Sequence, residues 1–272
     1  MSDGSASTFP DADYEPFWMD QSPLARQVSE HVHNAINDAI SRHDHLIASY
    51  DNWMAGPTEL GRLRDALTVG PINLAKCLPN TASITRVSLE IVRDWLFFSS
   101  GVKAVPLAIQ ARTILMGAGR ILYCLGPSSF EERLEHAQRV VLQEASSCLR
   151  ALKASRQFQA LSAQAPSKDA VEAVRAQVKA LTAATGGQAM GEASMLRGMA
   201  EVVAALLPDE DSAAQAHREH VSWMFQRYSG YAHGYGWPSM LPPVGLWADL
   251  GVITGAASLA MMHLNRSAGL SE

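Results

Sequence analysis

The chain has 272 residues, of which 47% are hydrophobic and 18% charged, and its formal net charge at pH 7 is −5. This composition is typical of a globular protein and excludes global disorder, while the acidic balance argues against sequence-independent binding along duplex DNA. The three cysteines show no Cys-x-x-Cys spacing, and their odd number fits reduced thiols in a cytoplasmic protein. The N-terminus lacks the apolar run of a secretory signal. The most apolar windows contain Arg or Asp, so we expect core helices and no membrane contact.

Helical spacing dominates most of the chain. Residues 1–20 are rich in Ser, Asp and Pro and predict a flexible tail before a single helical domain over 21–272. Shorter helices are expected between five long ones, over 23–54, 108–125, 130–156, 212–231 and 246–265. No stretch alternates with period two, so the prediction is an all-α bundle of about seven to eight helices without a sheet. The segment near 162–167 is a candidate domain seam, although a helix hairpin explains it equally well.

Polar residues and glycines mark several expected helix boundaries and contacts. Thr58 is placed to cap a short helix, and Ser129 begins a Ser-x-x-Glu capping box. Thr81 or Ser83 is the expected start of the helix that follows. Within the apolar helix over 108–125, the small residues Gly117-Ala-Gly119 predict that another helix approaches the backbone closely.

One segment, Phe225–Trp237, concentrates groups that bind phosphate, transfer protons and stack on bases. Arg227 and His233 are six residues apart in it, which on a straight helix separates them by about 120° around the axis. To act on one substrate they need a break in the helix near Gly230 or Gly234, the long reach of the arginine, or a second subunit.

The side chains around this pair also follow helical spacing. Three tyrosines at i, i+3 and i+7 predict one aromatic face on a continuous helix: Tyr228, Tyr231 and Tyr235. Trp223 precedes Arg227 by four residues, a spacing that allows a cation–π contact. Ser229 precedes His233 by four residues, so their side chains can form a hydrogen bond.

The Arg-x5-His spacing, followed by Gly-Tyr late in an all-α chain, resembles the signature of HEPN-domain proteins. Arg227 matches the Arg of that family and His233 its His. The next residue after the Arg, often a small polar one in active members, is Tyr228 here. The resemblance implies a helical homodimer that acts as a metal-independent endoribonuclease of a toxin–antitoxin or antiphage type. Its partners would be RNA and a cognate antitoxin or other protein, and no cofactor or metal is expected.

A broader resemblance covers most of the chain. Uncharacterised actinobacterial helical proteins carry an apolar helix with Arg, a Leu-x-Pro turn, then Glu-Arg, and later a Ser-Gly-x-Ala-His-Gly segment. The corresponding residues here are Arg112–Arg120, Leu125–Pro127, Glu132-Arg133 and Ser229–Gly234. This resemblance concerns the helical fold and brings no activity with it.

The HEPN resemblance implies transesterification at phosphorus. His233 would take a proton from a ribose 2′-hydroxyl or give one to the leaving oxygen, which is worth about 10²–10⁴ in rate. Arg227 would hold the non-bridging oxygens of the phosphate. The rest of the segment would bind single-stranded RNA, mainly by stacking: Tyr228, Ser229, Tyr231, Tyr235 and Trp237.

Two other interpretations stay open. Arg, His and Tyr near a helix end often cap carbonyls and bind one another, which would make this a non-catalytic helical interaction or scaffold protein. Alternatively, Arg112 and Arg120 lie in an apolar helix, where a buried arginine needs a carboxylate or a ligand anion. Glu90 and Asp94 on the preceding helix are the expected partners, and a small anionic ligand is the other candidate.

Overall fold

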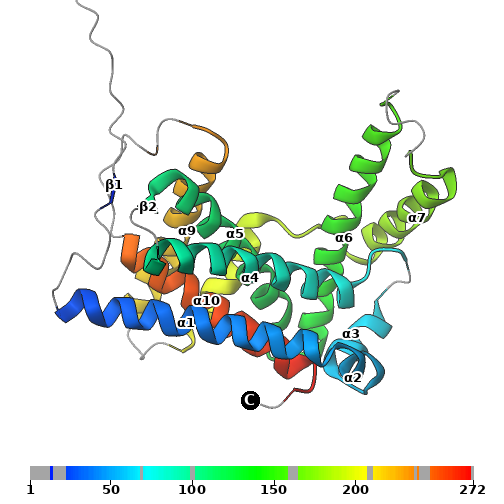
Figure 1. The fold of residues 1–272 in the computed structure, drawn as a ribbon. Coiled ribbons are helices and arrows are strands. Elements are labelled where there is room, and N and C mark those ends of the chain that lie inside the picture. The colour runs from blue at the N-terminus through cyan, green and yellow to red at the C-terminus, as the bar shows by residue number, and fades with distance from the viewer. Residues whose placement is uncertain are drawn as a thin grey trace, which may run out of the picture.

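The computed structural model describes residues 13–14, 23–67, 70–98, 102–158, 165–206, 211–235, 238 and 246–270, and they form the predicted all-α bundle (Figure 1). The helices are α1 (Pro23–Ala48), α2 (Tyr50–Ala55), α3 (Glu59–Ala66), α4 (Leu74–Phe98), α5 (Ala104–Leu125), α6 (Phe130–Ser155), α7 (Lys168–Ala184), α8 (Glu192–Ala204), α9 (Asp211–Ala232) and α10 (Leu246–Ser267). Within these ranges α3 is the short helix expected after Thr58, whereas α2 is an additional short helix. The strands β1 (Asp13–Tyr14) and β2 (Val102–Lys103) pair antiparallel where no strand was expected, and they add no layer.

The apolar helix α5 lies at the centre of the bundle. Its residues are apolar nearly all round, and such a helix is stable only when neighbours cover every face. It packs against α4, α6, α8, α9 and α10, while α1 covers α4 and α10 from the outside (Figure 1). Ile114, Leu115 and Ile121 are therefore fully buried. α5 thus positions each helix that carries a candidate functional residue.

The glycines of α5 confirm the predicted close approach. A Cβ at Gly117 would meet the Thr85 hydroxyl of α4 at 1.9 Å, and one at Gly119 would meet the Met195 methyl of α8 at 3.2 Å. A side chain at Gly117 requires that α4 moves or that the Thr85 hydroxyl leaves its hydrogen bond to the Thr81 carbonyl (2.8 Å). Two different helices are thus packed directly against the backbone of α5.

Two of the expected helix caps are confirmed, and two boundaries differ. The hydroxyls of Thr58 and Ser129 accept backbone N–H bonds at the starts of α3 and α6, at 3.0 and 3.2 Å. The single helix expected over 23–54 divides at Ser49 into α1 and α2.

The second difference is the start of α4, which is at Leu74 and not at Thr81 or Ser83. The Asn73 side chain caps it by accepting the N–H of the second helical residue at 2.7 Å. Pro79 lies inside the helix and cannot donate a backbone hydrogen bond. The cap and the burial of the first turns against the core outweigh that loss.

The helices α6 and α7 form a hairpin whose outer part projects from the bundle (Figure 1). A small core cluster lies between them, made of Ala145, Leu149, Val171 and Val174. The Gln177 amide binds both the carbonyl and the N–H of Ile72 (2.6 and 3.0 Å), which fastens α7 to the segment before α4. The candidate seam near 162–167 falls in this hairpin connection, of which residues 165–167 are described. The expected tail, 1–20, lies outside the described residues except for β1.

The cysteines are free thiols, as predicted. Burial raises the pKa of the Cys124 thiol to about 12 and that of Cys77 to about 11. Both side chains therefore stay protonated at neutral pH and behave as small apolar groups.

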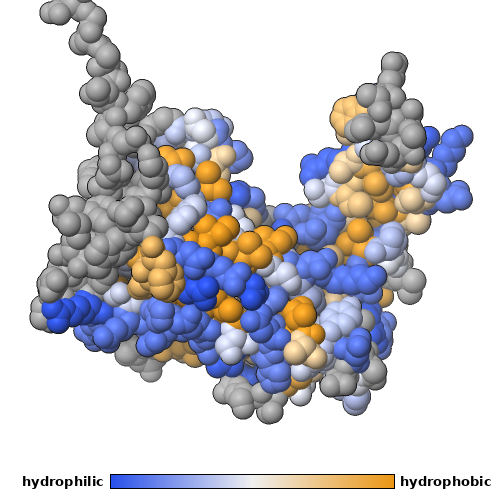
Figure 2. Space-filling view, viewed as in Figure 1, coloured by the Kyte–Doolittle hydropathy of each residue, from blue (hydrophilic) through white to orange (hydrophobic). Residues whose placement is uncertain are grey.

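An exposed apolar area lies over the middle of the face shown in Figure 2, where α4 crosses the bundle. Ile84 and Val87 of α4 are 60% and 51% exposed. At the start of α5, Val105 and Ile109 are also exposed. Exposed apolar side chains that gather on one face commonly mark a protein contact.

We expect two glycine-to-alanine substitutions to change stability in opposite directions. Gly117→Ala should lower the free energy of unfolding by about 1–3 kcal/mol, because α4 or the Thr85 hydroxyl must move away from the new methyl group. Gly255→Ala in α10 is the matched control, since a Cβ there meets nothing within 4 Å. It should raise the free energy by about 0.5–1 kcal/mol through helix propensity. Urea unfolding measures both, and equal effects would contradict the close α4–α5 packing.

Candidate functional site

Arg227 is buried near the end of α9, with only 5% of its surface exposed. Its Nε is fully enclosed and has no hydrogen-bond partner among the described residues. Within the described residues no carboxylate lies at ion-pair distance from its guanidinium. A buried charge without a partner destabilises the folded state. Either the fold tolerates this loss of stability, or an anion binds to the arginine and neutralises its charge.

His233 lies in the turn that ends α9 and is exposed. Gly234 has a φ of +71°, and the Tyr235 N–H bonds back to the Gly230 carbonyl (2.9 Å), which closes the helix in a Schellman arrangement. The His233 ring has the Tyr235 ring 5.9 Å away. Arg227 and His233 thus belong to one helix end, but one faces the interior and the other faces solvent.

Tyr228 belongs to a buried hydrogen-bonded cluster that links α9 to α10. It is 3% exposed, and its hydroxyl donates to Asp249 Oδ2 at 2.6 Å. The other oxygen of Asp249, a residue only 2% exposed, binds Nε2 of His220 at 2.6 Å. Both oxygens of a buried carboxylate are therefore satisfied by α9. We call Tyr228, Asp249 and His220 the carboxylate clamp.

The predicted aromatic face does not form. The burial of Tyr228 in the clamp leaves its ring no free side for a base, which corrects its expected role in stacking. Tyr231 is half-buried, and Tyr235 is exposed beyond the end of the helix. Trp237 lies outside the described residues. Trp223 is 41% exposed and makes no cation–π contact with the buried arginine four residues later.

Ser229 hydrogen-bonds with a distant arginine and not with His233 as expected. Arg112 of α5 donates from Nε to the Ser229 hydroxyl at 3.0 Å. Its Nη2 lies 3.5 Å from a carboxylate oxygen of Glu192 on α8, and its guanidinium carbon lies 5.7 Å from the ring centre of Phe225. The structure thus joins two sequence segments that are 117 residues apart, and both belong to the broader resemblance.

The ion pairs expected between α4 and α5 do not form. Arg120 binds Glu144 of α6 at 2.8 Å, while Arg112 binds Glu192. Glu90 is held by Arg86 at 2.8 Å. The expected partner Asp94 lies beside Arg93 (3.4 Å). The physical reason is the rotation of α4, whose face toward α5 carries Thr85, Leu89 and Val92, so that its charges lie elsewhere. Both α5 arginines have a carboxylate partner without any ligand.

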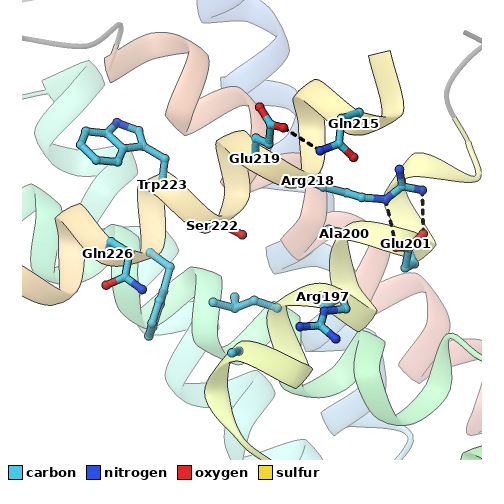
Figure 3. Close-up of a pocket in the computed structure, with 12 residues that line it drawn as sticks. Arg197, Ala200, Glu201, Gln215, Arg218, Glu219, Ser222, Trp223 and Gln226 are labelled. Carbon is cyan, nitrogen blue, oxygen red and sulfur yellow. Dashed lines mark hydrogen bonds and ion pairs between the residues drawn. The ribbon is translucent and has the colours of Figure 1, made fainter. Parts of the chain in front are cut away.

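A groove of about 600 Å³ runs between α8 and α9, and sequence reasoning missed it (Figure 3). Figure 3 shows Trp223 and Gln226 at one end, with Arg197 and the Arg218–Glu201 ion pair at the other. The apolar part is formed by Ala193, Leu196, Ala200 and Phe225. The groove depends on the pairing of two helices, which the sequence does not specify, and the one sequence signal near it is the tryptophan that follows the polar first turns of α9.

A second cavity of about 640 Å³ lies between α1, α9 and α10. His217 lines it, and its Nε2 is enclosed with no hydrogen-bond partner in the part of the chain that the structure describes. Burial, followed by the nearby His220 and Arg218, lowers the pKa of His217. Its imidazole is therefore neutral at pH 7. In the described part of the chain no three side chains come together as metal ligands.

We expect the carboxylate clamp to stabilise the fold. Tyr228→Phe removes the donor to one oxygen of a buried carboxylate, which should lower the free energy of unfolding by about 1–3 kcal/mol. Tyr235→Phe is the matched control at an exposed hydroxyl and should change it by less than about 0.5 kcal/mol. Thermal and urea unfolding of the two variants measure the difference. Equal stabilities would mean that the clamp does not hold α9 on α10.

No family model, no curated protein and no solved structure matches the chain. The HEPN resemblance therefore stays a prediction. Within the ranges that the structure describes, no helix is both long and apolar enough to cross a membrane.

Proposed function

We propose that this protein is HEPN-like and acts on RNA at the C-terminal end of α9, as a metal-independent endoribonuclease or an RNA-binding protein of a toxin or defence type. The observation that carries the proposal is the buried guanidinium of Arg227, which has no carboxylate partner among the described residues. Most arginines here with buried or half-buried side chains have an acid beside them, as Arg112 and Arg120 do. A phosphate that reaches the rim of this side chain would supply the missing negative charge.

The position of His233 supports a role in proton transfer. An imidazole must be accessible to take a proton from a ribose hydroxyl or to deliver one to a leaving oxygen. His233 is exposed in the turn after the helix, and no described side chain bonds to its ring nitrogens. The Arg112–Ser229 hydrogen bond adds a second cation to the same helix end, close to where the backbone of RNA would lie.

A homodimer is part of the proposal, because Arg227 and His233 face in different directions on one chain. The exposed apolar side chains of Val105 and Ile109 lie on α5, within two helical turns before Arg112. Arg112 is the residue that hydrogen-bonds to Ser229 near the end of α9. A second copy bound there would bring its own helix end near the first. The exposed histidine of one subunit could then serve a phosphate held by the arginine of the other.

The alternative is a non-catalytic interaction protein, and a specific observation favours it. Tyr228 and Ser229, two residues of the segment, make contacts that hold α9 against α10 and α5. If Arg227 and His233 are structural as well, the whole segment is a helix anchor. Its partners would then be proteins that bind to the exposed apolar surface.

Cleavage of total RNA and tRNA in the presence of EDTA tests the proposal. His233→Ala should reduce the rate by about 10²–10⁴ and leave the melting temperature unchanged, since the side chain is exposed. His45→Ala on α1 is the matched control at another exposed histidine and should keep full activity. Products with 2′,3′-cyclic phosphate ends identify the transesterification.

Arg227→Met separates the two interpretations. If the arginine serves RNA, the variant should lose about 10²–10³ in rate. Its free energy of unfolding should stay equal or rise by about 1–3 kcal/mol, because a buried unpartnered group is replaced by an apolar one of similar length. A strong loss of stability, together with no binding or cleavage of RNA by the wild type, would contradict the proposal and favour the interaction protein.

The dimer has its own test. Ile109→Glu should convert the protein from dimer to monomer in light scattering coupled to size exclusion, because a charge is costly in an apolar interface. It should also reduce RNA cleavage if the active site needs both copies. Phe158→Glu, at the end of the α6–α7 hairpin, is the control at an exposed apolar residue and should stay dimeric. A monomeric wild type would remove the dimer from the proposal.

A further inference from the structure

We propose that the groove between α8 and α9 is the binding site for single-stranded RNA, with one base stacked on Trp223 and a phosphate bound by Arg197. This inference rests on the proposed function and names the part of the substrate that lies away from the reacting phosphate. The groove lies next to the end of α9, since Phe225 and Gln226 line it and Arg227 follows them in the chain.

Trp223 is the residue that indicates a nucleic-acid base as the ligand. An indole with 41% of its surface exposed leaves a large apolar face in water, and no described contact covers it. Stacking of a base on an aromatic ring is tolerant of sequence because every base has a π-face. Figure 3 shows the indole at the end of the groove where Gln226 also lies, and a side-chain amide there can hydrogen-bond to a base edge.

The charges of the groove leave one cation available. Glu201 is neutralised by Arg218, which binds both of its oxygens at 2.9 Å. Glu219 accepts a hydrogen bond from the Gln215 amide at 2.6 Å. Arg197 lies opposite on α8, is exposed, and has no ion pair within the described residues. With two arginines against two glutamates, the groove is less acidic than the chain as a whole, and only Arg197 is free to bind a phosphate.

The groove also connects to the proposed reaction site by direct contacts. The Phe225 ring forms part of its apolar floor and lies beneath the Arg112 guanidinium at 5.7 Å. Arg112 in turn binds the Ser229 hydroxyl. A strand that leaves the groove at Phe225 therefore meets Arg112 before it reaches the end of α9. A groove between two packed helices, whose axes are about 8–10 Å apart, admits a single strand and excludes a duplex.

The experiment measures binding of a fluorescein-labelled oligouridylate by anisotropy, on the His233→Ala protein so that the RNA stays intact. Trp223→Ala should weaken binding about 5- to 150-fold, the loss expected for one stacked base, while Trp223→Phe should recover part of it. Arg197→Ala should lower the slope of log K against log salt by about 0.7, which corresponds to one phosphate of a single strand. A duplex of the same length should bind more weakly than the single strand.

Two control variants match these substitutions elsewhere on the surface. Phe98→Ala removes an aromatic ring that is 75% exposed at the end of α4, and Arg150→Ala removes an exposed arginine of α6. Neither residue lines the groove, so both proteins should bind RNA like the parent. Because all four side chains are exposed, the five substitutions should keep the melting temperature.

The possible results distinguish this inference from the proposed function. If the parent protein binds or cleaves RNA but Trp223→Ala and Arg197→Ala bind like it, the groove inference is overturned and the proposed function stands. If the wild type neither binds nor cleaves any RNA, both are overturned. Equal loss of binding in the Phe98→Ala control would also overturn the inference, because the effect would then not be specific to the groove.

Discussion

The burial of α5 from Ala111 to Leu125 is the constraint on which the rest of this structure depends. A helix that is apolar nearly all round needs neighbours on most of its surface, and here α4, α6, α8, α9 and α10 provide them. Gly117 and Gly119 set how closely the helices on two sides approach it. The orientation of α9, and with it the direction in which Arg227 and His233 face, follows from this packing.

The end of α9 combines supporting contacts with groups that have no structural partner. The carboxylate clamp links Tyr228 and His220 to Asp249, and Arg112 holds Ser229. These bonds offset the cost of burying polar atoms, since each buried oxygen receives a donor. Arg227 differs from Arg112 and Arg120 because no carboxylate lies beside it among the described residues, and its buried Nε has no partner there either. A site that keeps one unsatisfied cation beside well-satisfied neighbours is what anion binding requires, and this contrast is the basis of the proposed function.

Local charge matters more than net charge for this proposal. The net charge of −5 disfavours long electrostatic tracks along a nucleic acid. A short single strand needs few phosphate contacts when aromatic stacking supplies part of the binding energy. The groove between α8 and α9 has this character, with one exposed indole, one free arginine and two glutamates that are already hydrogen-bonded. The two glutamates would still repel the phosphates of a strand whose backbone does not lie against Arg197. This repulsion favours one position of the strand in the groove.

The amino-acid sequence by itself determined the all-α class, the close contact at Gly117, the caps at Thr58 and Ser129, and the end of α9 near Gly234. Each of these depends on residues that are near in the chain or on steric limits of one residue. Only the tertiary structure decided that α4 begins at Leu74, since the burial of its first turns outweighs the effect of Pro79.

The tertiary structure also decided the partners of the charged residues. Helical spacing allowed Glu90 and Asp94 to reach α5, but the rotation of α4 turned them away, and Arg112 bound Ser229 and Glu192. The single Asp249 in an apolar helix was visible in the sequence, whereas its bonds to Tyr228 and His220 were not. Side-chain partners and grooves depend on how two helices rotate against each other, and local spacing carries no information on that rotation.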